Sequence, residues 1–349
     1  PPLSKALWKG KPVDGIWRHT ESHSVDLLLS RKVERVDPER QTVVDDRGDE
    51  YSYDQLLLAT GGRPRRLPFG GGDILYYRTV TDFRRLHAQA ERAQRFAVIG
   101  GGFIGAEIAA ALAMNGRQVT LIFPEATLGA RVFPDDLGRF LNDYYREKGV
   151  TVLSHTFVTG VEGRDAHVLV RTSDRELMAD MVVAGIGIQP NVELAQSAGL
   201  AVEDGIVVDE LLRTTRPRIF AAGDVAAFYF AALGKRLRFE HEDNALSMGR
   251  RAGRNMAGEQ AAYLHLPFFY SDLFDLGYEA VGEVDSRLET LVDWKQPFRE
   301  GVVYYHAGGV VRGVLLWNVW NQVATARRLI TTRQLARPGL LQSQTAATA

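Results

Sequence analysis

The sequence contains no cysteine. Without thiols, the chain has no structural disulfide, thiolate metal site, cysteine nucleophile or redox-active dithiol. If the protein carries electrons, they cannot rest on sulfur. The absence also fits a reducing, cytoplasmic compartment, although a cysteine-free chain fits other compartments as well.

A large net charge and a long apolar run are also missing. The formal net charge is -1 at pH 7, which gives no electrostatic footprint for nucleic acid or for an anionic membrane. No apolar run reaches the roughly 18 residues that a helix needs to span a bilayer. We therefore expect no nucleic-acid partner and no membrane span, while anchoring through a preceding segment stays open.

What is present is typical of a globular protein. The 349 residues are 45% hydrophobic and 24% charged, and a chain of this length is expected to form roughly two to three domains. It opens with "PPLSKALW", where the fixed φ of proline suits the entry to a helix. Ser4 is a candidate cap, and residues 5–8 are the expected first helical turn.

The next segments alternate between strand-like and helical patterns. Residues 25–60 are typical of a β-meander, with turn residues at 45–49, and the Gly-, Pro- and Arg-rich stretch 61–73 is predicted to be a loop. Helical periodicity begins near residue 81, where Thr81 or Asp82 is the candidate cap. Later helices are predicted in "DDLGRFLNDYYREKG" and "DNALSMGRRAGRNMAG", and later strands in "VTVL", "HVLVRT", "MVVAGIG" and "EGVVYYHAGGVVRGVLLWN".

A glycine-rich turn stands between a buried strand and a helix. Gly100–Gly105 matches G-x-G-x-x-G, the strand is expected at Phe96–Ile99, and the helix is expected from about Phe103 to Asn115. A second strand at Val119–Phe123 completes a βαβ unit. In this context the glycines permit a tight turn, a close approach of pyrophosphate and close helix–sheet packing, and the helix N-terminus holds the phosphates. The pattern predicts a nicotinamide dinucleotide site.

An acidic residue follows at the distance that the fingerprint requires. Glu125 lies 20 positions after Gly105, where a carboxylate accepts hydrogen bonds from an adenosine ribose. This favours NADH over NADPH, although Arg131 is near enough to meet a 2'-phosphate. The alternative is a glycine-rich turn in an α/β protein that binds no nucleotide.

Four motifs in order indicate a family. "LLLATGGRPR", the fingerprint, "GIGIQPN" and "RIFAAGDVA" resemble the two-dinucleotide flavoprotein reductases of the pyridine nucleotide-disulfide oxidoreductase family. "PPLSK" is similar to the cysteine-free branch that contains ferredoxin and rubredoxin reductases, monodehydroascorbate reductase and apoptosis-inducing factor. "LIFPE", "PNVELAQSAGL", "FYSDLFDLGYEAVGEVDS" and "VLLWNVWN" look most like apoptosis-inducing factor and its bacterial relatives.

The resemblance implies an α/β fold class with two Rossmann-like, doubly wound domains and an α/β C-terminal domain of the dimerisation or interface type. The FAD domain, interrupted by the NAD domain, would comprise residues 1–90 and 189–264, with NAD(P)H bound by 91–188. Residues 265–340 would form the C-terminal domain, and 341–349 are predicted to be a disordered tail. In the family, "PPLSK" follows a first βαβ unit that binds the FAD pyrophosphate. The chain is therefore expected to lack that unit and to bind FAD poorly.

The family pairs the lysine of "PPLSK" with the glutamate after the fingerprint. Carried over, this makes Lys5 and Glu107 catalytic, with Lys5 beside the flavin, where a cation stabilises developing negative charge. The alternative is two unrelated surface charges. Asp224 of "FAAGD" is expected to hydrogen-bond the FAD ribityl chain and Arg65 to contact the cofactor, whereas Asp224 by itself would suit a simple turn.

Further positions carry over from the resemblance. "FEHEDNA" places charged residues at a helix start, whose positive dipole end would favour an anionic reduced flavin; His241 could instead be a cap or packing residue, and a metal role is excluded by the spacing. Tyr270 stands where apoptosis-inducing factor has tryptophan, which reduces the stacking area. The residues assigned to FAD are Lys5, Val33, Arg65, Asp224, His241, Glu242 and Tyr270. Those assigned to NAD are Gly100, Gly101, Gly102, Phe103, Ile104, Gly105, Glu125, Arg131, Gly187, Glu240, Glu279 and Asn318.

The sequence therefore predicts an FAD-dependent NADH oxidoreductase. Hydride would pass from NADH to the flavin, and electrons would pass on to an iron–sulfur protein such as ferredoxin or rubredoxin, to a quinone-like molecule or to oxygen. The alternative is a redox-sensing interaction protein resembling apoptosis-inducing factor, with NADH-dependent homodimerisation and slow turnover. A third hypothesis is a flavin-free nicotinamide-binding scaffold.

Overall fold

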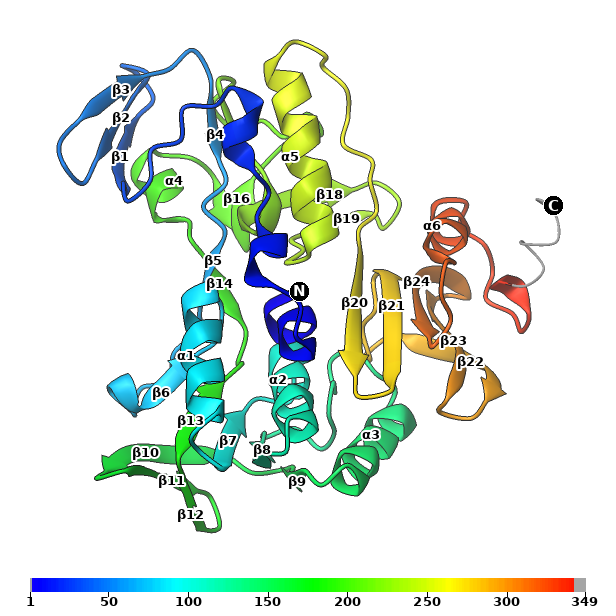
Figure 1. Cartoon of the computed structure of the whole chain (residues 1–349). Coiled ribbons are helices and arrows are strands. Elements are labelled where there is room, and N and C mark those ends of the chain that lie inside the picture. Colours follow the sequence, from blue (N-terminus) through cyan, green and yellow to red (C-terminus); the bar gives the residue numbers. More distant parts are fainter. Residues whose placement is uncertain (1, 342–349) are drawn as a thin grey trace. The chain divides into compact units, whose positions relative to one another are not determined.

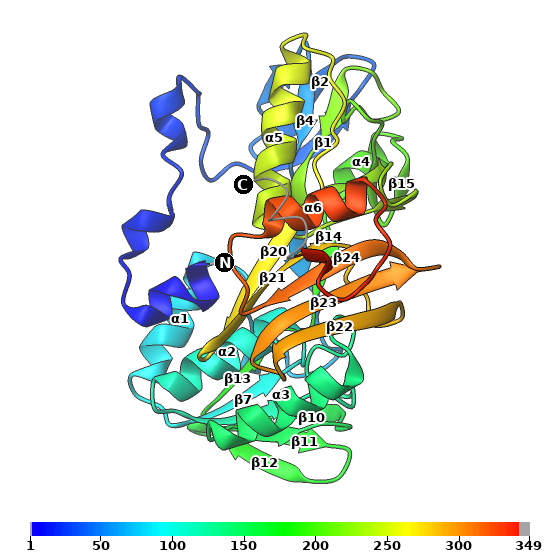
Figure 2. The same ribbon diagram turned by 90° about the vertical axis from the view of Figure 1, so that its right-hand side faces the viewer.

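The computed structural model describes residues 2–341, and Figures 1 and 2 show its elements in two views. The chain forms two compact units. Unit 1 comprises Pro1–Pro12, Pro64–Ile188 and Phe269–Ala349, and unit 2 comprises Val13–Arg63 and Gln189–Phe268. The chain thus passes from one unit to the other after residues 12, 63, 188 and 268.

A parallel five-stranded sheet is the centre of the middle part of unit 1. Its strands follow the order β6 (Ile74–Tyr76), β13 (Met181–Ala184), β7 (Arg95–Ile99), β8 (Gln118–Ile122) and β9 (Thr151–Leu153). Three helices accompany it: α1 (Val80–Ala90), α2 (Phe103–Met114) and α3 (Asp135–Glu147). β13 is buried at every residue and β7 at all but the first, as expected for parallel strands covered on both faces. This sheet confirms the predicted α/β class.

A small antiparallel sheet packs against the parallel one. It consists of β10 (Val158–Arg164), β11 (His167–Thr172) and β12 (Glu176–Ala179). Val161 and Val170 join Ile99 and Ile122 in one buried hydrophobic cluster. The glycine-rich loop before β6 is fixed to this sheet by Asp73, whose carboxylate accepts a 2.8 Å hydrogen bond from the Gly163 amide.

The start of α1 differs from the sequence prediction. The cap is neither Thr81 nor Asp82, because the helix begins at Val80 and Thr79 is its N-cap. Thr79 and Asp82 form a capping box: the Thr79 hydroxyl accepts from the Asp82 amide, and the Asp82 carboxylate accepts from the Thr79 amide at 2.7 Å. Asp82 therefore acts at the third helical position, where the reciprocal partner of a cap belongs.

The N-terminal segment is not the predicted α-helix. It forms two 3-10 turns, η1 (Pro2–Ser4) and η2 (Ala6–Lys9), and Lys5 between them makes no side-chain cap. The Ser4 hydroxyl does not cap either, since it donates to the Glu107 carboxylate, 103 residues away. Trp8 is buried against Phe83 of α1, with ring centroids 5.7 Å apart. Tertiary contacts, not local helix propensity, set this conformation.

The C-terminal part of unit 1 is a second five-stranded sheet with one helix. The strand order is β20 (Phe268–Leu273), β21 (Leu276–Gly282), β24 (Val310–Trp317), β23 (Glu300–Ala307) and β22 (Glu289–Gln296), followed by α6 (Val323–Thr331). Strands β21, β24, β23 and β22 pair antiparallel. Fully buried aromatic side chains fill its core, and Tyr278 stacks on Trp317 with ring centroids 5.7 Å apart.

Unit 2 contains three further sheets and two α-helices. Antiparallel strands β1 (Val33–Asp37), β2 (Thr42–Asp45) and β3 (Glu50–Ser52) form the predicted meander, but no strand begins at residue 25 as the hydrophobic pattern suggested. β4 (Leu56–Leu58) pairs in parallel with β17 (Ile219–Ala221). A mixed sheet contains β15 (Val202–Glu203), β16 (Gly205–Val207), β18 (Ala226–Phe230) and β19 (Lys235–Leu237). The helices are α4 (Glu193–Ser197) and α5 (Glu242–Met256).

The connecting strands β5 (Gly62–Pro64) and β14 (Ile188–Pro190) contain two of the crossing points. The domain boundaries predicted from the sequence stay a proposal. Apart from Leu341, the predicted disordered tail lies outside the described residues. Within residues 2–341, no helix has both the length and the apolar character that a bilayer crossing requires.

Candidate active site

Lys5 and Glu107 form a buried ion pair. Lys5 Nζ lies 2.7 Å from Glu107 Oε1, and the side chains are only 8% and 4% exposed. Lys5 comes from the turn between η1 and η2, and Glu107 from the first half of α2. The expected pairing of these residues is thus present in unit 1. Because burying two charges is costly unless they are paired and hydrogen-bonded, this arrangement differs from an ordinary surface salt bridge.

Two serine hydroxyls complete the coordination of the Glu107 carboxylate. Ser4 donates to Oε2, and Ser271 of β20 donates to Oε1 at 2.6 Å. Both serines are at most 5% exposed. The carboxylate therefore receives three donors from two separate segments, the N-terminal turns and β20, which fixes its position and its hydrogen-bonding capacity.

Aromatic side chains surround this pair. Lys5 Nζ lies 4.9 Å from the ring centroid of Tyr270, which is 38% exposed. Phe269 contacts Phe103 at the start of α2, with centroids 5.1 Å apart. β20 thus brings Phe269 next to the first turn of the fingerprint helix and Tyr270 next to Lys5.

The glycine fingerprint has the geometry of a dinucleotide cradle. A Cβ on Gly105 would lie 1.8 Å from the Gly100 carbonyl oxygen, so only glycine permits this close packing. Gly100 has φ +115°, a left-handed conformation that favours glycine. A Cβ on Gly102, the N-cap of α2, would meet nothing within 4 Å. That opening lies at a helix N-terminus, where a phosphate is stabilised by amides and by the helix dipole.

The two residues considered for the adenosine end lie after β8. Glu125 is half-buried, and its carbonyl accepts from the His155 amide at 3.0 Å. The Arg131 side chain is exposed, while its backbone carbonyl accepts from the Ser286 amide at 3.1 Å. Glu125 follows shortly after the carboxyl end of β8 at Ile122. The ribose and 2'-phosphate assignments stay predictions.

The other predicted residues of unit 1 have the following contacts. Arg65 is exposed, and its Nε donates to the Ile188 carbonyl at 3.0 Å, next to Gly187. Glu279 has a carboxylate oxygen that is buried without a hydrogen-bond partner, and burial raises its pKa. The Asn318 amide accepts from the Gly277 amide at 2.7 Å and donates to the Arg299 carbonyl at 2.8 Å. Asn318 therefore has a structural role, whereas the unpaired oxygen of Glu279 is a group that a ligand amide would satisfy.

In unit 2, the predicted flavin residues gather at the N-terminus of α5. Asp224 follows β17 in a short 3-10 turn, and the positive φ of Gly223 brings this turn against Ala245 of α5. Arg238 connects the cluster: its guanidinium donates to the Asp224 carbonyl at 3.1 Å and to the Glu240 carboxylate at 2.8 Å. Its side chain is only 7% exposed. Sequence reasoning missed Arg238, because an arginine in a strand-end segment carries no motif.

The start of α5 has three of the predicted residues in sequence. His241 is the N-cap residue and makes no side-chain cap; burial lowers its pKa to about 4, against the opposing charge of Asp243, so the ring is neutral near pH 7. Glu242 in the first turn is ion-paired with Arg18. The predicted FAD residue Val33 begins β1, where it pairs with Asp45. Among the described residues, no group of three or more His, Asp or Glu side chains is arranged to hold a metal.

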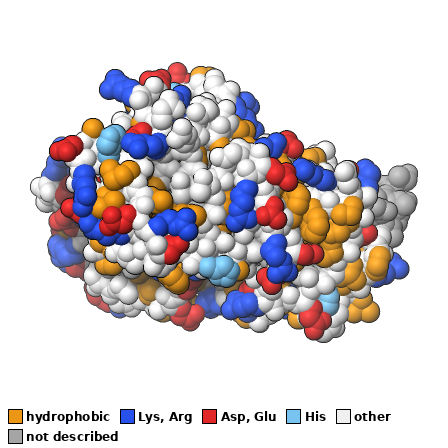
Figure 3. All heavy atoms as spheres, turned by 90° about the horizontal axis from the view of Figure 1, so that it is seen from below, with side chains coloured by type: hydrophobic (Ala, Val, Ile, Leu, Met, Phe, Trp, Pro, Cys, Tyr) orange, Lys and Arg blue, Asp and Glu red, His pale blue; other side chains and the backbone are white. Residues whose placement is uncertain are grey.

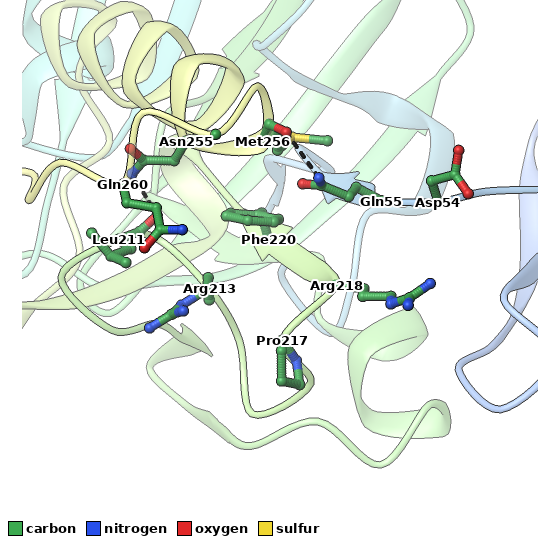
Figure 4. A pocket seen from close by; sticks show the side chains of 11 residues that line it. Asp54, Gln55, Leu211, Arg213, Pro217, Arg218, Phe220, Asn255, Met256 and Gln260 are labelled. Atoms are coloured by element: carbon green, nitrogen blue, oxygen red, sulfur yellow. Dashed lines mark hydrogen bonds between the residues drawn. The ribbon is translucent and has the colours of Figure 1, made fainter.

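Unit 2 also contains a hollow of about 480 Å³, which is lined by none of the residues predicted to bind a cofactor. Figure 4 shows Phe220 at its centre with Arg213 and Arg218 at its side. Gln55 and Arg218 directly precede β4 and β17, so the hollow is at the amino ends of these strands. Asp224 follows the carboxyl end of β17. Ligands of α/β sheets bind at the carboxyl ends, so this hollow is not the predicted cofactor site.

The comparison with protein families decides the relationship. Residues 1–249 match the family described as pyridine nucleotide-disulphide oxidoreductase, and residues 252–297 and 291–332 match the C-terminal domain of mitochondrion-associated apoptosis-inducing factor. The chain belongs to the pyridine nucleotide-disulphide oxidoreductase family. The expected activity class, an NAD(P)H-dependent flavoprotein oxidoreductase, is thereby confirmed.

Curated relatives of this oxidoreductase include several electron-transfer reductases. The chain is 36% identical to the ferredoxin–NAD(+) reductase component of the anthranilate 1,2-dioxygenase system of Burkholderia cepacia, covering 95% of this chain and 82% of the relative. It is 34% identical to putidaredoxin reductase of Pseudomonas putida, covering 98% and 84%. It is 31% identical to apoptosis-inducing factor 1 of Dictyostelium discoideum, covering 96% and 71%.

A solved structure supports the same relationship. The covalent complex of putidaredoxin reductase with putidaredoxin matches with a TM-score of 0.93 and 33% identity, covering 100% of this chain and 89% of that chain. These comparisons confirm the two-dinucleotide fold with a C-terminal domain, and they support the oxidoreductase interpretation and not the alternative of a redox-sensing interaction protein.

The residues present fit both cofactors of the family. For NAD, the fit rests on the open approach at Gly102 and the close packing of Gly105. For FAD, the residues of unit 2 that fit are those toward the ribityl and ring end, namely Asp224 and the first turn of α5. On the face seen in Figure 3, basic and acidic side chains are interspersed.

Proposed function

We propose that this oxidoreductase takes hydride from NADH, in preference to NADPH, and delivers electrons one at a time to an iron–sulfur protein. In this proposal residues 91–188 bind the nicotinamide nucleotide, and 1–90 with 189–264 bind FAD. When bound, FAD supplies the conversion of a two-electron donor into single-electron transfer. With no cysteine in the chain, that transfer cannot run through a protein dithiol.

The observation that carries the proposal is the buried Lys5–Glu107 pair beside the fingerprint helix. Lys5 holds a positive charge at a site from which water is largely excluded, with Glu107 2.7 Å away. A fixed cation in such a site stabilises negative charge that develops during reduction of a nearby group. Tyr270, over which Lys5 Nζ lies at 4.9 Å, bounds the same space and can stack on a planar ring.

The preference for NADH rests on Glu125. A carboxylate at the end of the second strand of the unit accepts hydrogen bonds from both ribose hydroxyls and repels a 2'-phosphate. The exposed Arg131 acts in the opposite direction, since a guanidinium can bind a 2'-phosphate.

The iron–sulfur acceptor is supported by the names of the relatives. The Burkholderia relative is a ferredoxin–NAD(+) reductase component, and the solved neighbour is a reductase bound to putidaredoxin. No residue of this chain selects among iron–sulfur proteins, so the proposal is limited to the class.

The test is a turnover assay on FAD-loaded protein, prepared from the full-length gene product. NADH oxidation is followed with a [2Fe–2S] ferredoxin, with a quinone and with oxygen as separate acceptors, and NADPH replaces NADH in a parallel series. We expect flavin absorbance, NADH-dependent bleaching of it, and faster turnover with ferredoxin than with the other acceptors. A preparation that takes up FAD but is not bleached by NADH contradicts the proposal, as does equal turnover without ferredoxin. An NADH-dependent shift in gel-filtration volume without turnover would favour the redox-sensing alternative.

A further inference from the structure

Three successive residues of β20 contact the N-terminal segment or its partner. Tyr270 lies under Lys5, with Nζ 4.9 Å from the ring centroid, and Asp272 pairs with Lys9 at 3.1 Å. Between them, Ser271 donates to Glu107 at 2.6 Å. Side chains alternate along a strand, which is why Tyr270 is 38% exposed while Ser271 is 1% exposed.

Ser271 and Lys5 share one oxygen of Glu107. Both donate to Oε1, whereas Ser4 donates to Oε2. Ser4 is the neighbour of Lys5 on a short 3-10 segment, so its hydroxyl moves with the lysine. Ser271 is the donor that comes from a strand of the C-terminal sheet. Ser271 therefore sets the position of the Glu107 carboxylate relative to the sheet.

Ser271 lies next to the aromatic core of the C-terminal sheet. The adjacent strand β21 packs closely on it, since a Cβ on Gly277 would lie 3.2 Å from the Ser271 carbonyl oxygen. The same strand carries the fully buried Tyr278, which stacks on Trp317 of β24. The backbone that carries the Ser271 hydroxyl is thus placed by the core of this sheet.

From this arrangement we propose that Ser271 is a positioning residue for the Lys5–Glu107 pair: it holds Glu107 so that the Lys5 ammonium stays fixed. The inference rests on the proposed function for its catalytic consequence, but not for its geometric one. Without the Ser271 hydroxyl, Lys5 is the one remaining donor to Glu107 Oε1 among the described residues, and the ion pair is held less firmly.

The geometric consequence is tested on the flavin-free chain. Brief acetylation with acetic anhydride is followed by mass spectrometry of the peptide that contains Lys5 and the exposed Lys11, so Lys11 is an internal standard. We expect Ser271→Ala to raise the Lys5/Lys11 labelling ratio about threefold or more. Ser271→Thr keeps the hydroxyl and should stay within about a factor of 1.5 of wild type. A Ser271→Ala ratio equal to wild type, or an equal rise in both variants, overturns the proposal.

The catalytic consequence is tested by a double-mutant cycle. On FAD-reconstituted protein, the rate of flavin reduction at saturating NADH is measured for wild type, Ser271→Ala, Glu107→Gln and the double variant. We expect Ser271→Ala to reduce the rate about tenfold with KM for NADH nearly unchanged, and to have less than about a twofold effect when Glu107 is already replaced.

The two possible failures are distinguishable. Multiplicative effects of Ser271→Ala and Glu107→Gln mean that Ser271 does not act through Glu107, which overturns the inference while wild-type turnover keeps the proposed function. Wild-type protein that NADH cannot reduce overturns the proposed function, and the labelling ratio then still decides the position of Ser271.

Discussion

At the scale of the residue, the buried Glu107 carboxylate is stabilised by an ion pair and by two hydrogen bonds. Removing one member of a buried pair leaves an uncompensated charge, which typically costs about 3–5 kcal/mol. Glu107 satisfies three donors at once, so its replacement affects more than the lysine. Function and stability are therefore linked at this position.

Replacing Glu107 with Ala should slow flavin reduction more than it weakens NADH binding. The pair acts on charge that develops during the reaction, so the loss appears in the limiting rate, by on the order of 100-fold. Stopped-flow measurements over a range of NADH concentrations separate the two effects. Equal losses in rate and in affinity would contradict this role, and Glu107→Gln is the control for shape without charge.

Replacing Glu125 with Ala should raise KM for NADH about tenfold with little change in turnover, because one charge-assisted hydrogen bond is worth on the order of 1.5 kcal/mol. Binding of NADPH should be affected less. Initial-rate kinetics with both nucleotides measure the ratio. An unchanged KM for NADH would remove Glu125 from the ribose site.

At the scale of the element, the β7–α2–β8 unit was the part most readable from sequence. The predicted strand at Phe96–Ile99 and helix from Phe103 differ from the structure by one residue at an end, because apolar runs and glycines encode them locally. Ser4 shows the limit of prediction from local sequence. Its hydroxyl looks like a cap in sequence, but its partner Glu107 is reached only through the tertiary fold.

Alanine substitutions at two glycines of this unit should affect different properties, one the stability and the other the NADH affinity. Gly105→Ala drives a Cβ into the Gly100 carbonyl and should destabilise unit 1 by about 3 kcal/mol. Gly102→Ala meets no protein atom and should keep the melting temperature, while the added methyl obstructs the phosphate approach and lowers NADH affinity about tenfold or more. Thermal melts and NADH titrations distinguish them. A Gly102→Ala protein with normal affinity would argue against the cradle.

The start of β7 is anchored by Asp180, whose side chain is 16% exposed. Burial by itself would raise the pKa of Asp180, but hydrogen bonds from the Gln94 and Arg95 amides and from the Arg95 guanidinium outweigh it and hold the pKa well below its usual range. Since the folded pKa is depressed, the stabilisation is fully present above the unfolded pKa of about 3.9 and is lost progressively as pH falls from there through the folded pKa.

Asp180→Asn should therefore cost on the order of 2 kcal/mol at pH 7, and this cost should begin to fall below about pH 4 and continue to fall toward the depressed folded pKa. Urea unfolding at several pH values measures this difference. Asp174→Asn is the matched control, because Asp174 pairs with Arg175 on an exposed loop, where ion pairs contribute little. A constant effect of Asp180→Asn from pH 3 to pH 7 would contradict the assignment.

At the scale of the whole molecule, the four motifs gave the family because each has a local signature, whereas the supporting residues had none. Arg238 and Ser271 hold the predicted Glu240 and Glu107 in place, yet neither belongs to a motif. Each of the two compact units is also assembled from segments far apart in the sequence. Packing of distant segments determines such groupings, and a single sequence does not display it.

The two units should respond separately to the two cofactors. A ligand that binds only the folded state stabilises it by about 2.7 kcal/mol at a concentration of 100 times its dissociation constant. Hydrogen exchange should show that NADH protects the fingerprint region of unit 1 and that FAD protects the first turn of α5 in unit 2. If NADH protected α5 and left the amides after Gly102 unchanged, the assignment of the nucleotide to unit 1 would fail.

The chain moves between its two units after residues 12, 63, 188 and 268, so neither unit is one continuous stretch. No single proteolytic cut or stop codon can release either one intact. A dissection into parts requires a spliced gene, for example residues 13–63 joined by a flexible linker to residues 189–268. Conversely, deletion of the first dozen residues removes Lys5 and leaves the buried Glu107 carboxylate without its ion-pair partner.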